Sequence, residues 1–385
     1  MEEAAGRSSG RVLVDGRQRV NGRAEAVREL SALPIWVAPM AGGPSTPALV
    51  TAAVRAGGFG FLAGGYQKAA ALRSDMQAVR AAGIAAFGVN LFVPGAPASD
   101  PAAVASYVAS LRGEAARSAA GPGDVPGREP GGGPGDRAGA EPGEPTWDDD
   151  GWADKISLLL EEPPASVSFS FGCPPSDVAA EFRRRGTLVG ITVTSAAEAA
   201  LAADAGADCL IVQGREAGAH SGTFTPDHPA DLRPGLLDLM AEVSAVTDLP
   251  LVAAGGLADP GGVRAAIAVG ATAVSLGTAF LRCPESGAHP LHKAALADPR
   301  RTATAMTRAF SGRPARALVN RFVLDHPDVP AGYPEINNAT RPLRAAAAAA
   351  GDPDGMSLYA GHGFRTASDR PAGEIIDELA AGLPR

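Results

Sequence analysis

The sequence predicts an α/β protein built as a (β/α)₈ TIM barrel with a small, mostly helical C-terminal appendage. Three observations indicate this fold: eight short apolar segments of strand length, Ala-rich segments of helical length between them, and a glycine after the helical segments. Gly57, Gly83, Gly206 and Gly270 hold such positions, where glycine commonly ends a helix. An open doubly wound sheet is the alternative that this alternation leaves open.

The expected strands are residues 35–38, 60–63, 86–90, 166–170, 188–192, 209–213, 250–254 and 273–276. Helices are expected at residues 46–56, 68–82, 195–205 and 260–269. Because strands and helices alternate eight times, a parallel sheet that closes on itself is favoured over an open one.

The chain divides into three regions by its composition. Residues 1–32 are expected to be a flexible lead-in with a short helix near 24–30, and residues 33–283 to form the barrel. Residues 284–385 contain helical segments and are expected to pack on the barrel as the appendage. Residues 113–145 are so rich in Gly, Pro and charge that they cannot bury enough apolar surface to order themselves. We expect a disordered insertion there.

Composition excludes several classes of function. A hydrophobic content of 45% with 20% charged residues indicates a soluble globular protein, and the net charge of −8 argues against nucleic-acid binding. No segment reaches the ~18 apolar residues that a membrane span needs. The three cysteines lack metal-ligand spacing, which fits a reducing compartment and no metal site. We therefore expect a cytoplasmic protein, and the sequence does not choose between a monomer and a homodimer.

Candidate functional residues follow the predicted strands. In a barrel, the carboxyl ends of all strands converge on one site. The first strand is followed by Met40 and Ala41, the third ends at Asn90, and the sixth ends at Gln213 before a loop with Gly218 and His220. The seventh is followed by Gly255 and Gly256, and the eighth holds Ser275 and Leu276 before Gly277 and Thr278. Of these side chains, His220 is best suited to move a proton near neutral pH.

These residue types point to a flat phosphorylated cofactor. The set contains no lysine for a Schiff base and no pair of carboxylates. Glycine turns after the last two strands are typical phosphate sites of barrels, since their backbone N–H groups can face the ligand. Amides such as Asn90 and Gln213 can pair with ring heteroatoms, although they could equally satisfy backbone groups at the barrel rim. FMN fits this pattern best.

Seven segments carry a resemblance to a known family: residues 38–47, 87–92, 167–174, 213–220, 253–257, 276–280 and 310–322. In these motifs the chain resembles nitronate monooxygenases of the 2-nitropropane dioxygenase superfamily, from about residue 33 to the C-terminus apart from the insertion. The resemblance implies that FMN is bound by Asn90, Gln213, Gly218, Gly255, Gly256 and residues 275–278, with the Met40–Ala41 backbone against the flavin. It also implies that His220 is the catalytic base, and that O₂ oxidises an alkyl nitronate to a carbonyl compound and nitrite.

The sequence departs from the family at two positions beside the base. Ala219 replaces the second glycine of the usual Gly-Gly-His, and Ser221 stands where Arg is frequent. The extra methyl of Ala219 is tolerable if its φ is negative and unfavourable otherwise.

Two other functions remain open at this stage. One is an NAD(P)H-dependent FMN reductase acting on a quinone or an enoyl thioester, and the other is a non-catalytic flavin-binding barrel. Among the remaining polar residues, Cys173 is expected to be a small packed residue, His362 a loop histidine, and residues 148–150 a solvated start of a helix.

Overall fold

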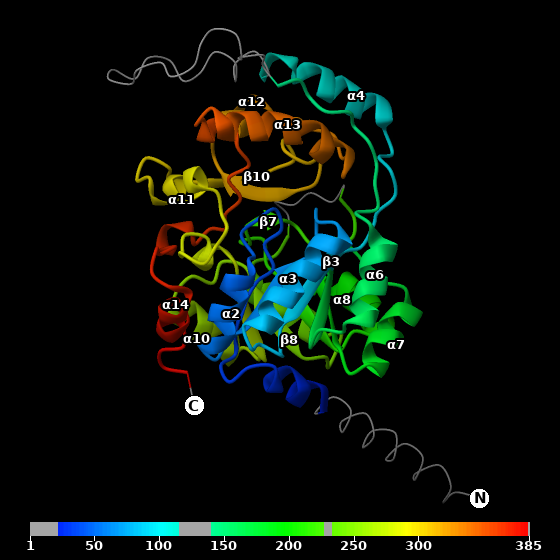
Figure 1. The fold of residues 1–385 in the computed structure, drawn as a ribbon, viewed down its shortest axis with the longest axis vertical. Coiled ribbons are helices and arrows are strands. Elements are labelled where there is room, and N and C mark those ends of the chain that lie inside the picture. The colour runs from blue at the N-terminus through cyan, green and yellow to red at the C-terminus, as the bar shows by residue number, and fades with distance from the viewer. Residues whose placement is uncertain (1–21, 115–139, 227–232, 384–385) are drawn as a thin grey trace, which may run out of the picture.

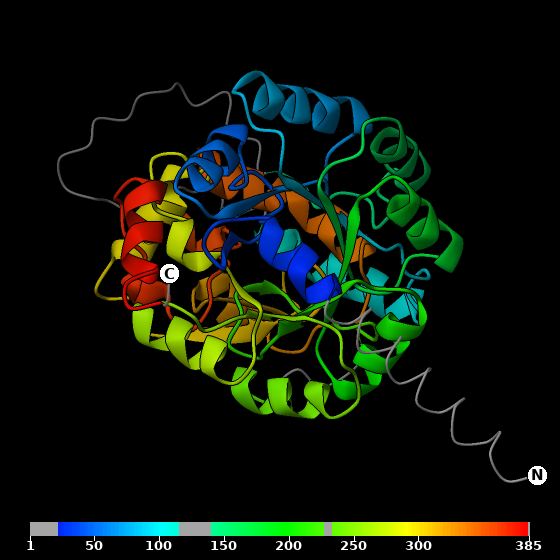
Figure 2. The ribbon, with the colours of Figure 1, turned by 90° about the horizontal axis from the view of Figure 1, so that it is seen from below.

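The computed structural model describes residues 22–114, 140–226 and 233–383. Within these residues, eight parallel strands close into a barrel in the order β1-β2-β3-β4-β5-β6-β8-β9, with β9 pairing to β1. Figure 2, from below, shows helices surrounding the sheet. The (β/α)₈ barrel is thus confirmed. The strands are β1 Ile35–Val37, β2 Phe59–Ala63, β3 Gly88–Phe92, β4 Ser166–Ser170, β5 Leu188–Val193, β6 Cys209–Gln213, β8 Leu251–Ala254 and β9 Ala273–Leu276.

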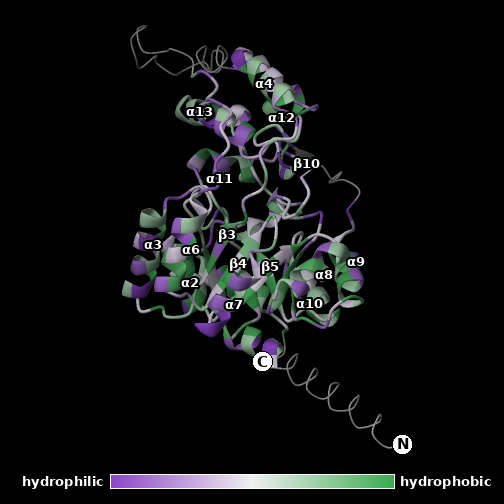
Figure 3. Ribbon diagram, turned by 90° about the vertical axis from the view of Figure 1, so that its right-hand side faces the viewer, coloured by the Kyte–Doolittle hydropathy of each residue, from purple (hydrophilic) through white to green (hydrophobic). Residues whose placement is uncertain are grey.

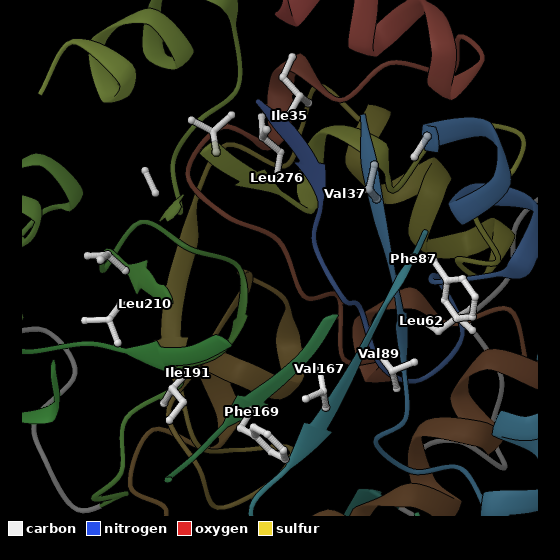
Figure 4. Close-up of a cluster of buried hydrophobic side chains, with 14 of the residues drawn as sticks. Ile35, Val37, Leu62, Phe87, Val89, Val167, Phe169, Ile191, Leu210 and Leu276 are labelled. Carbon is white, nitrogen blue, oxygen red and sulfur yellow. The ribbon is translucent and has the colours of Figure 1, made fainter. Parts of the chain in front are cut away.

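Successive residues of each strand face opposite sides of the barrel wall, as the two-residue period requires. In β1, Ile35 and Val37 belong to the layer that packs on the helices, whereas Trp36 lies in the barrel interior with Phe59 and Phe61. Figure 4 shows part of the outer layer, and Figure 3 shows how the apolar residues concentrate on the strands. The large aromatic rings therefore fill the inside of the barrel and leave its carboxyl end for polar residues.

Helices cover the outside of the barrel, and their first residues carry ordinary capping signals. Thr46, Ser195 and Asp259 each accept a hydrogen bond from a backbone N–H of the first turn that follows. The expected helices at 46–56, 68–82, 195–205 and 260–269 correspond to α2, α3, α8 and α10. The outer helices are α2 Pro47–Arg55, α3 Ala69–Ala81, α6 Trp152–Glu161, α7 Ser176–Arg184, α8 Ala196–Asp204, α9 Leu236–Ser244, α10 Pro260–Ala268 and α14 Ala372–Leu379.

The C-terminal region both covers and completes the barrel. Helix α14 packs against α2 and α10, so residues near the end of the chain close the outer ring of helices (Figure 1). The cap, as we call it, lies over the site and comprises α4 Pro101–Ser110, β10 Thr304–Thr307, β11 Ala315–Leu318, α12 Arg321–Asp325 and α13 Glu335–Ala349. Val104 and Tyr107 of α4 pack with Phe310, Phe322 and Ile336, so the segment after β3 shares one apolar core with the C-terminal region. Helix α11 Pro290–Ala297 lies beside the cap.

One small sheet was not expected from the sequence. Strand β7, Ala219–His220, pairs antiparallel with β11, which pairs with β10, so residues 284–385 contain strands as well as helices. These strands are short and Ala-rich, without the alternation of β-branched residues that marks a strand in a sequence. The sheet links the barrel loop after β6 to the cap.

The ends of the predicted flexible segments are only partly described. Of the expected insertion at 113–145, residues 115–139 lie outside the described residues; after them, the N–H of Gly143 donates to the Ala339 carbonyl of α13 at 2.8 Å. Residues 22–29 of the lead-in are helical, and Val27 packs at the base of the barrel interior, whereas residues 1–21 are not described. Of the helices in the described ranges, none has the length and apolar character needed to cross a membrane.

Candidate active site

A cavity of about 620 Å³ lies between the carboxyl ends of the barrel strands and the cap. Its size falls within the range of roughly 300–1,000 Å³ that is typical of cofactor and ligand pockets. Every residue predicted from the sequence to bind the cofactor or act as the base lines this cavity. They are Met40, Ala41, Asn90, Gln213, Gly218, His220, Gly255, Gly256, Ser275, Leu276, Gly277 and Thr278.

Strand periodicity explains why the polar side chains meet there. Asn90, Gln213 and Ser275 lie two residues after strand positions that face the barrel interior, namely Gly88, Ile211 and Ala273. Each side chain therefore also points inward, at the last turn of the strand before the loop. The aromatic layer below them closes the barrel, so these side chains form the floor of the cavity.

His220 lies in β7, opposite Ala315 of β11. Its Nε2 is 2.8 Å from the Ser311 hydroxyl, and its ring packs against Tyr359, Tyr333 and Phe171 at centroid distances of 5.2, 5.7 and 6.0 Å. Ser311 thus occupies one ring nitrogen and leaves Nδ1 as the nitrogen that can serve a ligand. The cap therefore fixes the orientation of a side chain that belongs to a barrel loop.

The environment of His220 favours its neutral form. Withdrawal of the imidazole from water, followed by the positive charges of Arg313 and Arg344, lowers its pKa to about 3. The ring is therefore a neutral imidazole near pH 7. A neutral imidazole has one unprotonated ring nitrogen, which can accept a proton from a substrate.

Gln213 and Asn90 hold the loops that surround the cavity. Gln213 Oε1 accepts from the Gly222 N–H at 2.7 Å, and Gln213 Nε2 donates to the His220 carbonyl at 3.2 Å. Asn90 Nδ2 contacts the Ser168 and Ser170 hydroxyls at 3.0 and 3.2 Å. Both amides thus satisfy neighbouring protein groups, and Asn90 Oδ1 and the second Nε2 hydrogen of Gln213 remain for a ligand.

The glycine turns at the other side of the cavity have no room for side chains. Gly255 and Gly256 have φ values of +105° and +70°, and a Cβ at either position would lie within 2.9 Å of Ala217 or Glu216. A Cβ on Gly218 would lie 2.4 Å from the N of Gly361. Gly361 belongs to the C-terminal loop, residues 358–363, and its N–H donates to Thr278 Oγ1 at 3.0 Å. Backbone from three parts of the chain thus converges at one end of the cavity.

The departures at Ala219 and Ser221 have structural consequences. Ala219 has a φ of +61°, so the unfavourable case foreseen for its methyl group applies. Ser221 is buried, and its carbonyl accepts from Arg313 Nε at 3.3 Å. A guanidinium does therefore lie beside this loop, but it comes from the β10–β11 connection.

The charged lining of the cavity is positive. Among the described residues that line it there is no Asp or Glu, whereas Arg341 and Arg344 contribute guanidinium groups. Arg344 is held by the carbonyl and side-chain oxygens of Asn337, both at 2.9 Å, which are neutral acceptors. An anionic ligand is therefore favoured in this cavity of a protein with net charge −8.

Other residues singled out in the sequence lie away from the chemistry. His362 is exposed and does not line the cavity, although Gly361 and Gly363 do. Burial raises the pKa of the Cys173 thiol to about 11, which supports a packing role rather than a nucleophile. Asp150 is not a solvated residue: it pairs with buried Lys155 at 2.8 Å and accepts from the Tyr66 N–H at 3.0 Å. In the described ranges no cluster of residues could hold a metal ion.

The comparisons with known proteins agree with this geometry. A profile of the family described as nitronate monooxygenase matches residues 25–382. The chain belongs to the nitronate monooxygenase family. Members of this family are oxidoreductases, so the protein is an enzyme. It is 39% identical to a nitronate monooxygenase of Pseudomonas aeruginosa over 354 residues, which cover 91% of this chain and 96% of the relative. It is 32% identical to a probable nitronate monooxygenase of Bacillus subtilis over 342 residues, or 87% and 91% of the two chains.

Solved structures show the same relationship. A nitroalkane oxidase from Streptomyces ansochromogenes has a TM-score of 0.85 and 45% identity, and the match covers 93% of this chain and 97% of that one. FabK from Thermotoga maritima matches with a TM-score of 0.65 and 25% identity over 92% and 94% of the two chains.

Several residues around His220 were not predicted from the sequence. Ser311 and Arg313 lie within the segment 310–322, and Phe171 lies within the segment 167–174. Both segments carry the family resemblance, but no role was predicted for these three residues. Their contacts with His220 and its loop depend on the cap folding back over the barrel. No local sequence pattern predicts such a contact between distant parts of the chain.

Proposed function

We propose that this enzyme is an FMN-dependent nitronate monooxygenase that uses O₂ to convert alkyl nitronates to a carbonyl compound and nitrite. Family membership supports the reaction class. The observation that carries the proposal is His220: a neutral imidazole held by Ser311, in a cavity lined by cationic side chains and glycine turns. The three cysteines are free, which supports our further proposal that the enzyme works in the reducing cytoplasm.

The cavity fits FMN on several grounds. The turns at Gly255–Gly256 and Gly277–Thr278 line the cavity and can offer backbone N–H groups to a phosphate. A side chain at Gly255 or Gly256 would collide with Ala217 or Glu216, so the first turn can be built only with glycine. No carboxylate in the described lining would repel that phosphate. Asn90 Oδ1 can accept from a ring N–H, and the Met40–Ala41 backbone lies at the same cavity. When bound, FMN would supply the electron transfer between the substrate and O₂ that side chains cannot perform.

His220 gives the site a way to use neutral nitroalkanes as well. The carbon next to a nitro group is acidic, and removal of its proton gives the nitronate. His220 Nδ1 accepts that proton in our proposal, because Nε2 is already engaged by Ser311 at 2.8 Å. A substrate that arrives as the nitronate needs no base, so His220 is required only for neutral substrates.

The cationic lining stabilises the anion that forms. Arg344 and Arg341 of α13 contribute positive charge to the cavity, and Arg313 lies beside the His220 loop. A nitronate is an anion, so its free energy is lowered in this field relative to that of the neutral nitroalkane. The aromatic side chains of Tyr66, Phe92 and Tyr359 line the same space and limit the access of water.

The deciding experiment compares two substrates in two proteins. Purified, FMN-loaded enzyme should consume O₂ and release nitrite with ethyl nitronate and with nitroethane. His220→Asn should lower kcat/KM for nitroethane by roughly 10²- to 10⁴-fold, the usual contribution of a general base, while its activity with preformed ethyl nitronate should change little. Equal losses on both substrates would contradict the base assignment.

An anaerobic spectrum tests the reaction class. Flavin absorbance that bleaches with nitronate and recovers with air, together with nitrite release, is the expected result. Flavin that ignores the nitronate but is bleached by NADH or NADPH would instead identify a reductase. A purified protein without flavin, and unable to bind added FMN, would contradict the cofactor assignment.

A further inference from the structure

Phe171 occupies a strained position at the edge of the active site. It follows β4 directly, lines the cavity, and has a φ of +77°. An aromatic residue is rarely found with a left-handed backbone, because its Cβ then crowds the carbonyl oxygen. Such strain persists only where surrounding contacts enforce it, and it is concentrated at functional sites.

The contacts that enforce this conformation come from three directions. The Phe171 N–H donates to the Gly222 carbonyl at 3.3 Å. The Arg313 guanidinium carbon lies 3.8 Å from the centre of the Phe171 ring, while Phe92 and Tyr333 pack on the ring at centroid distances of 4.6 and 5.5 Å. Phe171 is 7% exposed, and it lines the cavity together with His220.

Arg313 is itself firmly anchored. Its Nε donates to the Ser221 carbonyl at 3.3 Å, its Nη2 donates to the Thr223 carbonyl, and the residue is 4% exposed. The guanidinium therefore joins the β10–β11 connection of the cap to the loop that follows His220 and to the ring of Phe171. Phe171 is thus a wall that the cap holds in place, rather than a side chain free to rotate away.

We propose that Phe171, held by Arg313, limits the size of the group that a substrate can carry on its reacting carbon. This inference rests on the proposed function, since it specifies which nitronates the same site accepts. The reacting carbon must lie near His220, and the Phe171 ring meets the imidazole edge-on at 6.0 Å. A substituent that points toward β4 therefore meets the ring within one or two methylene groups. Short, unbranched alkyl nitronates are the class that this wall admits.

The test is a series of nitronates made from nitroethane, 1-nitropropane, 1-nitrobutane, 1-nitrohexane and 2-nitropropane. In the wild type, kcat/KM should fall along the series beyond nitropropane. Phe171→Ala should raise kcat/KM for 1-nitrohexane relative to nitroethane by about tenfold or more, because one methylene accommodated or rejected in an apolar pocket is worth roughly 10- to 200-fold. Phe171→Leu should shift the ratio in the same direction but less.

Met356→Ala is the control, since Met356 lines the same cavity, belongs to the apolar cluster with Ala295 and Leu296 of α11, and also loses apolar volume on truncation. It should leave the ratio of kcat/KM for 1-nitrohexane to kcat/KM for nitroethane within about threefold of that of the wild type. Arg313→Lys, which removes the flat stack on Phe171, should move the ratio toward that of Phe171→Ala. An unchanged ratio in both Phe171 variants, or an equal change in Met356→Ala, would overturn the proposal.

A binding measurement separates this inference from the proposed function. Nitroalkanes of the same series are titrated into the FMN-loaded protein, and the perturbation of flavin absorbance gives their dissociation constants. If no nitronate is oxidised but Phe171→Ala still gains affinity for the longer nitroalkanes, the proposed reaction is wrong and the proposed role of Phe171 in limiting chain length is supported. If nitronates are oxidised with the same chain-length preference in every variant, the proposed reaction is supported and the proposed role of Phe171 is wrong.

Discussion

At the scale of single residues, the loop around His220 combines strain with tight hydrogen bonding. Ala219 precedes the imidazole with a φ of +61°, and Gln213 binds the carbonyl of His220 and the N–H of Gly222. The hydrogen bonds of Gln213 therefore hold the loop in one conformation, although the left-handed backbone of Ala219 is unfavourable. Rigidity of this kind keeps a base in place before its substrate arrives.

Ala219→Gly is expected to stabilise the protein. Glycine removes a left-handed penalty of about 1–2 kcal/mol and adds up to about 1 kcal/mol of unfolded-state entropy, so the free energy of unfolding should rise by roughly 0.5–1 kcal/mol. Chemical denaturation measures the change. Ala217→Gly in the same loop is the control: its φ is not positive, and it should lose stability instead. A loss of stability in Ala219→Gly would show that the strand pairing with Arg316 outweighs the backbone preference.

At the scale of elements, the barrel could be predicted from the sequence but the small sheet could not. Each barrel strand is a short apolar run, and five of the eight, namely β2, β3, β5, β6 and β9, follow a glycine that ends a helix. These signals are local. Strands β7, β10 and β11 are defined by pairing between residues far apart in the chain, such as Ala315 with His220. The residues at the strand ends were therefore found from the sequence, whereas Ser311, Arg313 and Phe171 required the tertiary structure.

The C-terminal loop, residues 358–363, is the element that joins the cap to the glycine turns. The His362 N–H donates to the Glu216 carbonyl at 3.0 Å, and the Gly361 N–H to Thr278. The turns at 255–256 and 277–278 were predicted from the sequence to bind phosphate. The contact of the C-terminal loop with them could not be predicted, because it joins segments far apart in the chain.

Gly361→Ala is expected to weaken FMN binding. Its Cβ would lie 2.8 Å from the Glu216 carbonyl oxygen and 3.0 Å from the Gly218 nitrogen, so backbone must move at the proposed phosphate end. A rearrangement that costs about 1.4 kcal/mol or more would raise the dissociation constant of FMN tenfold or more. Fluorescence titration of the apoprotein measures this constant. Gly95→Ala, where a Cβ meets no atom within 4 Å, should bind FMN normally; equal affinity in both variants would remove the loop from the cofactor site.

At the scale of the whole molecule, buried imidazoles couple stability to pH. His292 is 8% exposed. Burial lowers its pKa to about 4, and the charge of His289 acts in the same direction, whereas a hydrogen bond to the Tyr359 backbone acts to raise it. The folded state therefore keeps His292 neutral while the unfolded state, with an ordinary pKa near 6.5, binds a proton. The stability that depends on neutral His292 is complete above pH 6.5 and is lost as the pH falls from 6.5 toward 4.

His292→Gln should make the enzyme less sensitive to acid. Between pH 7 and pH 4, the free energy of unfolding of the wild type should fall by roughly 2–3 kcal/mol more than that of the variant. Urea denaturation at a series of pH values gives both curves. His289→Gln removes an exposed imidazole from the N-cap of the same helix. Because the charge of His289 is only a lesser cause of the lowered His292 pKa, this variant should change the slope much less than His292→Gln does. Parallel curves for wild type and His292→Gln would contradict the assignment.

The pairing of β7 with β11 also bears on how the enzyme matures. The barrel strands are complete at Leu276, but the strand opposite His220 and the hydroxyl that orients its ring come from residues 311–318. During synthesis, the base-bearing loop would leave the ribosome well before the partners that hold it. A nascent chain whose barrel strands have already paired would therefore lack catalytic activity. Activity would begin only when the C-terminal region folds back over the opening and α14 packs against α2 and α10.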